Sequence, residues 1–200
     1  MKTSKIIEKG SRAALKLAET EKWDRLTLAD IASEAGLELS DFHGVADKQD
    51  LTLAIEPLFD GAMSEGSFDA DETARTRLFD VIMMRFEAME DVRDGAMSYL
   101  RWRDRSLDGL ALRLKARAAT AKWGLACAGL DGASKLPRGV QIAAIGWAIA
   151  QAERAWRQET SADLSRTMAA LDAELIKIEE RLEWISARRG KRKTQPEPEA

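Results

Sequence analysis

The residues that could perform chemistry are few, and their spacing does not form a catalytic site. His43 is the only histidine, which excludes a histidine-rich metal site, and Cys127 is the only cysteine, so no second thiol is present to bind zinc. Acidic residues are abundant, but no pair of them has an arrangement that indicates acid–base catalysis. No glycine-rich phosphate loop or nucleophile elbow occurs. We therefore expect no catalytic residues, no metal, no cofactor and no enzymatic activity.

The composition indicates a folded protein without a general attraction to polyanions. Of the 200 residues 45% are hydrophobic and 32% are charged, which argues against global disorder. The net charge is −3, so contact with phosphate requires a local basic patch. The lone cysteine permits no intramolecular disulfide, the N-terminal segment has charges among its apolar residues, and no uncharged apolar run could span a bilayer. These features predict a cytoplasmic protein.

Short helices are predicted for the first sixty residues. Thr27 with an acidic residue three positions later forms a variant capping box that begins the second helix, and Gly36 supplies the left-handed turn that ends it. A third short helix is predicted over about 39–45. A fourth runs from about 47 to 59, where Pro57 is expected to kink or end it.

Longer helices follow a segment, 61–72, that has the Gly, Ser and Asp content of a linker. The helices are predicted at about 72–89, 92–107, 107–130, 140–156 and 162–185, with a Gly- and Pro-containing loop at 131–139. The fold class is therefore all-α. The predicted organisation is a head at 1–60, a body at 71–186 and a disordered tail with basic and acidic residues at 187–200.

Two sets of apolar residues in the body are candidates for binding. The candidate ligand-binding residues are Phe79, Met83, Phe86, Trp123 and Trp147, because Met and aromatic side chains adapt to apolar ligands. Plain core packing explains the same helical spacing and is the commoner outcome for any one of them. The candidate dimer-interface residues are Leu164, Met168, Leu171, Leu175 and Ile178, which alternate at steps of four and three. Packing within the protomer is the alternative for this seam.

Residues 27–51 resemble the head of the TetR family of transcriptional regulators. Thr27 opens the second helix, "LADIA" (28–32) carries its core face, "AGL" (35–37) makes the turn, and Lys48 begins the last helix of the head. The resemblance implies a TetR-like fold with an N-terminal three-helix helix-turn-helix head on a larger helical body for ligand binding and dimerisation. It also implies a homodimer that binds a double-stranded DNA operator and releases it when an effector occupies the body.

The expected DNA contacts depart from the family pattern. The candidate DNA-binding residues are Lys5, Thr27, Leu39, Ser40, His43 and Lys48. His43 stands where the family usually has a tyrosine that contacts phosphate, and Gly44 follows it. Residues 21–60 contain three basic and ten acidic side chains, which disfavours phosphate binding, although the basic first helix offsets part of this deficit.

Residues 75–182 resemble a second group, the ubiquinone-biosynthesis accessory proteins that share the TetR fold and bind lipid. The matching stretches are 75–95, 121–131 and 155–175. This resemblance implies a vestigial helix-turn-helix and an isoprenoid lipid in the body. Two functions therefore remain open: a ligand-responsive regulator that binds operator DNA and an apolar small molecule, which is favoured, and a lipid-binding accessory protein.

Overall fold

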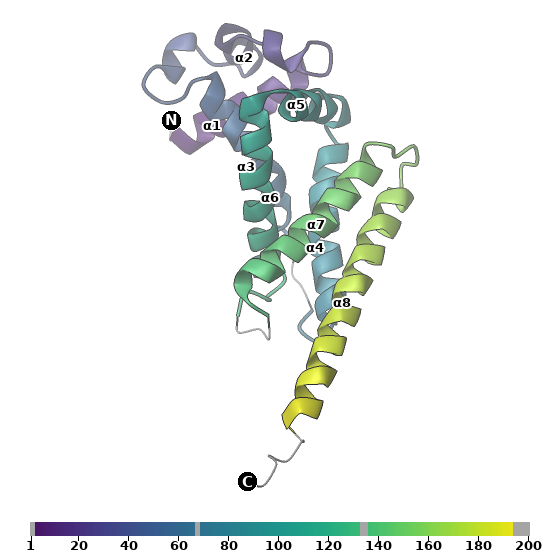
Figure 1. Ribbon diagram of the computed structural model, residues 1–200. Coiled ribbons are helices and arrows are strands. Elements are labelled where there is room, and N and C mark those ends of the chain that lie inside the picture. Colours follow the sequence, from purple (N-terminus) through teal and green to yellow (C-terminus); the bar gives the residue numbers. More distant parts are fainter. Residues whose placement is uncertain (1–2, 67–68, 133–135, 194–200) are drawn as a thin grey trace.

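The computed structural model describes residues 3–66, 69–132 and 136–193, and its regular structure in these ranges is entirely helical (Figure 1). This confirms the predicted all-α class. The elements in chain order are α1 (Thr3–Leu17), η1 (Trp23–Arg25), α2 (Leu28–Glu34), η2 (Leu39–Phe42), α3 (Lys48–Ala62), α4 (Ala74–Glu90), α5 (Arg93–Arg105), α6 (Leu107–Cys127), α7 (Arg138–Trp156) and α8 (Ser165–Lys193), where η1 and η2 are 3-10 helices.

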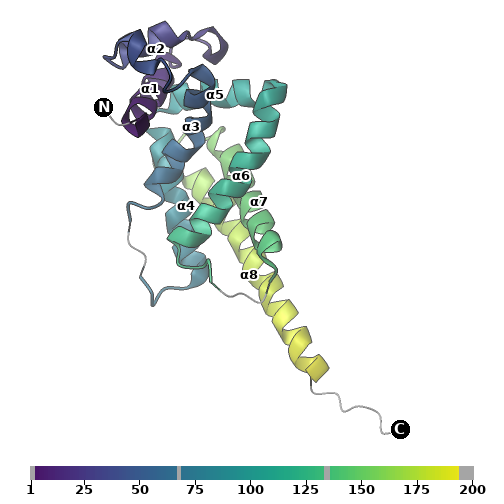
Figure 2. The same cartoon turned by 90° about the vertical axis from the view of Figure 1, so that its left-hand side faces the viewer.

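The elements divide between a small end and an elongated body. Helices α1 and α2 lie at one end, α5 lies across the molecule next to them, and α4, α6, α7 and α8 run away from that end (Figures 1 and 2). The C-terminal part of α8 extends beyond the other helices. Helix α8 packs mainly on α7 and also on α4, while α6 packs between α5 and α7.

Side-chain caps begin the short helices of the head. At α2, Thr27 Oγ1 accepts the Asp30 N–H at 3.2 Å, and the Asp30 carboxylate accepts the Thr27 N–H at 3.1 Å, so the predicted capping box is confirmed. At α3, Asp47 and Asp50 make the same reciprocal pair, with both distances 2.9 Å. These bonds satisfy N–H groups that a short helix leaves without acceptors.

Two helices run further than the sequence predicts. Pro57 lies inside α3, which continues to Ala62, so the predicted alternative that Pro57 ends this helix is wrong. Proline removes the partner of the Leu53 carbonyl group, but Leu53 is 44% exposed, so water can replace that bond. Helix α8 continues into the segment 187–200 that was predicted as a disordered tail. Residues 194–200 of that segment lie outside the described residues.

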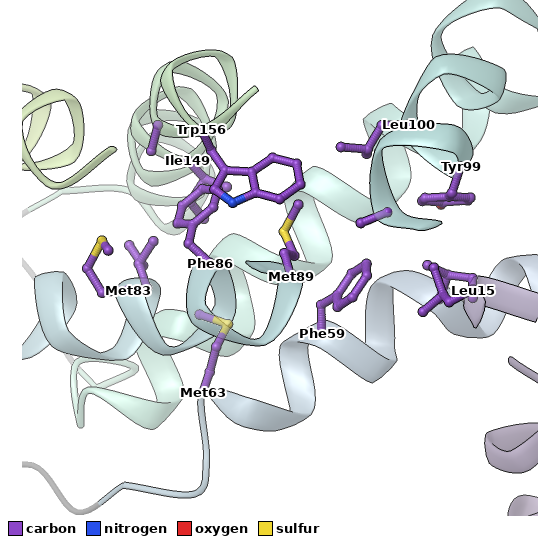
Figure 3. Close-up of a cluster of buried hydrophobic side chains, with 14 of the residues drawn as sticks. Leu15, Phe59, Met63, Met83, Phe86, Met89, Tyr99, Leu100, Ile149 and Trp156 are labelled. Carbon is purple, nitrogen blue, oxygen red and sulfur yellow. The ribbon is translucent and has the colours of Figure 1, made fainter. Parts of the chain in front are cut away.

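One hydrophobic core joins the head helix α3 to the body. Figure 3 shows Phe59 and Met63 of α3 together with Phe86 and Met89 of α4 and Trp156 of α7, and each of these side chains is at most 2% exposed. Full burial of side chains of this size contributes roughly 1.5–3 kcal/mol each. Helix α3 is therefore held by the body as firmly as by its neighbours in the head.

A second junction forms where α1 meets α5. A Cβ atom at Gly95 would lie 2.0 Å from the Leu15 carbonyl oxygen, so the two helix backbones are in direct contact at this point. Only glycine permits that approach, because any side chain would overlap the carbonyl group. The head is thus attached to the body through both α1 and α3.

Candidate functional site

The element expected to enter a DNA groove is a single turn. In place of the predicted helix over 39–45, the structure has the four-residue 3-10 helix η2, which ends at Phe42. Gly44 follows with φ +71°, and the Val45 N–H donates to the Phe42 carbonyl group instead of continuing a helix. At a rise of about 2 Å per residue, η2 is roughly 8 Å long. The prediction of a longer third helix is therefore wrong.

Acidic side chains around η2 act as helix caps. The Asp41 carboxylate accepts the Glu38 N–H at 3.0 Å, and Asp47 and Asp50 cap α3 immediately afterwards. These bonds hold the carboxylates at the surface that would face DNA. Leu39, Ser40 and His43 are exposed on the same surface, with Leu39 at 51%.

Few basic side chains of the head remain available for phosphate. Lys48 Nζ donates to the carbonyl oxygens of Trp23 at 2.9 Å and Asp24 at 3.2 Å, so it anchors η1. On α1, Arg12 pairs with Glu8 at 3.2 Å, and Lys16 pairs with Glu34 at 2.5 Å. Lys5 and Lys9 are exposed one turn apart on α1, with no ion pair to another described residue. Thr27 is committed to its capping box.

An apolar cavity of about 320 Å³ lies in the body between α4, α6, α7 and α8. The described residues of the lining carry no charged side chain; they are Ala74, Leu78, Leu125, Gly129, Leu130, Gly132, Leu136, Gln141, Ala144, Ile145, Ile178 and Leu182. Gln141 is the polar side chain among these residues, and its Nε2 donates to the Leu136 carbonyl oxygen at 2.8 Å. This volume is at the lower end of the range for small-molecule sites, and the lining suits a compact neutral apolar ligand.

The five residues predicted to bind ligand lie elsewhere. Met83 and Phe86 are 6% and 0% exposed and belong to the hydrophobic core, while Phe79 is half-buried beside α8. Trp123 and Trp147 are 44% and 59% exposed, and their indole N–H groups donate to the Asp60 carbonyl oxygen and to Glu174 Oε2. The structure therefore does not bring these five residues together around one cavity.

Charged side chains occupy the interior where head and body meet. We call Glu56, Asp60, Arg85, Arg103 and Glu153 the buried ion network, and each is at most 9% exposed. Arg85 of α4 bridges the Glu56 and Asp60 carboxylates of α3. Arg103 of α5 donates to Glu56 Oε1 at 2.6 Å and to Glu153 Oε1 at 2.7 Å, which links α3 to α7.

Residues at the edge complete this network. Thr120 Oγ1 donates to Asp60 Oδ2 at 2.9 Å, and Tyr99 OH donates to Glu56 Oε1 at 3.2 Å. Arg117 Nη2 and Arg157 Nη2 donate to Glu153 at 2.9 and 2.8 Å. The network is therefore shared among α3, α4, α5, α6 and α7. Most of its buried polar groups are paired, whereas Arg117 Nη1 has no hydrogen-bond partner among the described residues.

The arginines set the protonation of the buried glutamates. Burial alone would raise the pKa of Glu153, but Arg103 and two neighbouring arginines lower it to about 2. Burial also acts to raise the pKa of Glu56, but the attraction of Arg85 and Arg103 outweighs it, so the pKa of Glu56 is lowered. At Asp60 burial outweighs the attraction of Arg85 and raises the pKa. Glu56 and Glu153 are consequently charged at neutral pH.

This network was not predicted, although the sequence contains a signal for it. Arg85 lies three residues after Ile82 and four before Met89, so it falls on the apolar face of α4. Glu56 likewise lies four residues after Thr52 and three before Phe59, both of which are buried on α3. Charged residues at positions of an apolar face require a buried partner.

The leucine seam of α8 packs inside the protomer. Leu164, Leu171 and Leu175 are 4%, 0% and 2% exposed, Met168 is half-buried, and Ile178 lines the apolar cavity. Three of the five residues are therefore covered by contacts within one chain, whereas Met168 and Ile178 are only partly covered. Helices α7 and α8 also carry exposed apolar side chains, those of Val140, Trp147, Ile176 and Trp184.

The arrangement of a small helix-turn-helix end on a larger helical body is a TetR-like fold. A TetR transcriptional regulator from Nitrosomonas europaea ATCC 19718 superimposes with a TM-score of 0.69 at 17% identity, over 90% of this chain and 98% of that chain. A TetR transcriptional regulator from Rhodococcus sp. RHA1 gives a TM-score of 0.60 at 16% identity, over 85% of this chain and 94% of that chain.

Other comparisons add no closer relationship. No protein-family model and no curated protein matches the chain. The resemblance of residues 75–182 to ubiquinone-biosynthesis accessory proteins finds no support in the structural likenesses. None of the described helices is long and apolar enough to cross a membrane.

Proposed function

We propose that this protein is a homodimeric, ligand-responsive transcriptional regulator whose effector is a compact apolar molecule bound in the body. The observation that carries the proposal is the uncharged cavity of about 320 Å³ within a TetR-like fold. The lining helices α7 and α8 also expose apolar residues on their outer side, so the cavity and a dimer contact would share the same two helices.

Operator binding in this proposal depends on α1 as well as on η2. Lys5 and Lys9 supply unpaired positive charge on α1, whereas η2 offers Leu39, Ser40 and His43 for contacts to bases. Because few phosphates are contacted, the affinity for operator DNA should be modest. It should also decrease only gradually as the salt concentration rises, since each neutralised phosphate contributes to the slope of log K against log salt.

A gel-shift titration of the full-length protein against fragments of its own promoter tests the DNA half of the proposal. Lys5→Gln should weaken binding to all fragments and reduce the salt slope by about 1. Lys115→Gln is the control, because Lys115 is exposed on α6 and its loss changes the net charge equally. Absence of a shift at low salt for every upstream fragment would refute operator binding.

Thermal unfolding with farnesol and with decanol tests the ligand half, since one probe is an isoprenoid and the other is not. A ligand at about 100 times its Kd should stabilise the protein by about 2.7 kcal/mol. Ala144→Phe should fill the cavity and abolish the shift in Tm. Ala118→Phe, at an exposed position of α6, should leave the shift intact. Equal shifts in both variants would place the ligand outside the cavity.

A second candidate function is an apolar-ligand-binding protein that no longer reads DNA. The one-turn η2 with its capping carboxylates favours this candidate. It predicts that farnesol or decanol stabilises the protein while no promoter fragment is shifted, and it differs from the first candidate only in the DNA experiment.

A further inference from the structure

A groove of about 510 Å³ lies between η1 and α5, at the head end of the body. Its lining contains Lys22, Trp23 and Asp24 around the start of η1, and Ser98, Arg101, Trp102, Arg105 and Ser106 around α5. On α5 the lining residues 98, 101, 102 and 105 follow the spacing of one helix face. None of the residues that line the apolar cavity contributes to this groove.

The rim of the groove carries positive charge without a partner. The side chains of Lys22, Arg101 and Arg105 are exposed, and none of them makes an ion pair or hydrogen bond with another described residue. Arg101 and Arg105 lie one helical turn apart, a spacing at which like charges repel. An anion between them would relieve this repulsion and could accept bonds from both guanidinium groups.

The floor of the groove is aromatic. The Trp102 ring is half-buried, and its centroid lies 6.4 Å from that of Trp23 and 6.1 Å from that of Tyr99. Trp23 is 2% exposed, and its Nε1–H has no acceptor among the described residues. A flat ring stacked on Trp102 would extend this aromatic group and exclude water from it.

The charges of the lining indicate how strongly negative the ligand is. Three cationic side chains and Asp24 leave the groove with a net charge of +2. A phosphate monoester carries about −1.5 to −2 at neutral pH and matches this charge, whereas a carboxylate neutralises only part of it. The head and the whole chain are acidic, so this groove differs in sign from its surroundings.

We propose that the groove between η1 and α5 binds a small phosphate monoester that carries a flat ring, which is the chemistry of a nucleoside monophosphate. Arg101 and Arg105 hold the phosphate, Trp102 stacks on the ring, and Lys22 neutralises the remaining charge. This site goes beyond the proposed function, because it is separate from the apolar cavity and from the surface of η2.

Isothermal titration of the full-length protein with AMP, adenosine and inorganic phosphate tests this proposal. AMP should bind saturably, and adenosine and phosphate should each bind at least about tenfold more weakly, because each retains only half of the contacts. The double variant R101Q/R105Q should weaken AMP binding by at least about tenfold. Both arginines are exposed and unpaired, so their replacement should not lower the unfolding midpoint.

The matched control is K115Q/K122Q, which removes the same charge from exposed positions of α6 outside the groove. It should bind AMP as the unmodified protein does. The proposal is overturned if AMP gives no saturable heat at millimolar concentration, if adenosine binds as tightly as AMP, or if the control variant loses as much affinity as R101Q/R105Q. Farnesol stabilisation and promoter binding are measured separately, so failure here would leave the proposed function intact.

Discussion

Glu153 of α7 accepts hydrogen bonds from three arginines: Arg103 of α5, Arg117 of α6 and Arg157 at the C-cap of α7. Its carboxylate is therefore the point at which these helices are joined in the interior. A buried charge pair adds little net stability relative to apolar packing, but removal of one partner leaves the other charge buried and unpaired. The cost of a single substitution should consequently be large.

We expect Glu153→Gln to lower the free energy of unfolding by about 3–5 kcal/mol, because three arginines then share an uncharged amide. Urea denaturation measures this change. Glu87→Gln is the matched control at an exposed position of α4 and should change stability by less than about 0.5 kcal/mol. A loss below about 1 kcal/mol in Glu153→Gln would contradict a structural role for the network.

The same carboxylate predicts a dependence of stability on pH. The pKa of Glu153 is depressed in the folded protein from 4.5 to about 2, so its contribution is present above pH 4.5 and is lost as the pH falls toward 2. The contribution is on the order of 3 kcal/mol. Asp60, whose pKa is raised by burial, acts in the opposite direction. The difference between urea curves of the unmodified protein and Glu153→Gln should therefore shrink as the pH falls, and a constant difference would disagree with this assignment.

At the scale of elements, the contact between α1 and α5 depends on one missing side chain. Gly95→Ala would place a Cβ atom 2.0 Å from the Leu15 carbonyl oxygen, so the two helices would have to separate. We expect a destabilisation of roughly 1–3 kcal/mol or more, seen as a lower denaturation midpoint. Gly61→Ala in α3 is the control, because nothing lies within 4 Å of the added atom. It should stabilise the helix by about 0.5–1 kcal/mol.

Local signals predicted most of the elements. The capping pair of Thr27 and Asp30 marked the start of α2, and apolar periodicity located the long helices of the body. The same rules failed at η2, because most residues of 39–45 have weak helix propensity, Gly44 adopts a positive φ, and Asp41 accepts the Glu38 N–H as a cap. Pro57 was misjudged because its cost depends on whether water reaches the freed carbonyl group, which is a tertiary property.

The sites were less predictable than the elements because they combine residues that are distant in sequence. Trp123 and Trp147 have the apolar character of pocket residues but are held at the surface by hydrogen bonds to Asp60 and Glu174. The cavity is lined mainly by small and aliphatic residues that no pattern singles out. The pairing of Glu56 with Arg103 across 47 positions is set by helix packing alone.

At the scale of the whole molecule, the outer side of α7 and α8 is the surface that we propose for the dimer. Trp147 and Trp184 are 59% and 57% exposed there, and Val140 and Ile176 add to the same apolar side. We expect Trp147→Asp to convert the dimer to a monomer, because a desolvated charge would oppose association. Analytical ultracentrifugation measures the change.

Leu114→Asp provides the control for that substitution, since Leu114 is 68% exposed on α6 and the change of side chain is equivalent. It should remain dimeric. A dimer that survives Trp147→Asp, or one that Leu114→Asp dissociates, would move the interface away from α7 and α8.

The junctions between head and body also determine how a protomer could transmit a signal. The Gly95 contact and the buried ion network attach α1 and α3 to the body at two separate points, so we expect head and body to move together. In the proposed dimer the two protomers meet at the α7–α8 surface, and the same two helices line the apolar cavity. The head, which contains η2, lies at the other end of the molecule (Figures 1 and 2). A slight rotation of one protomer at the dimer interface would then produce a larger displacement of its head. Operator half-sites about 34 Å apart tolerate little of that displacement, so a small ligand could release DNA without any rearrangement inside the protomer.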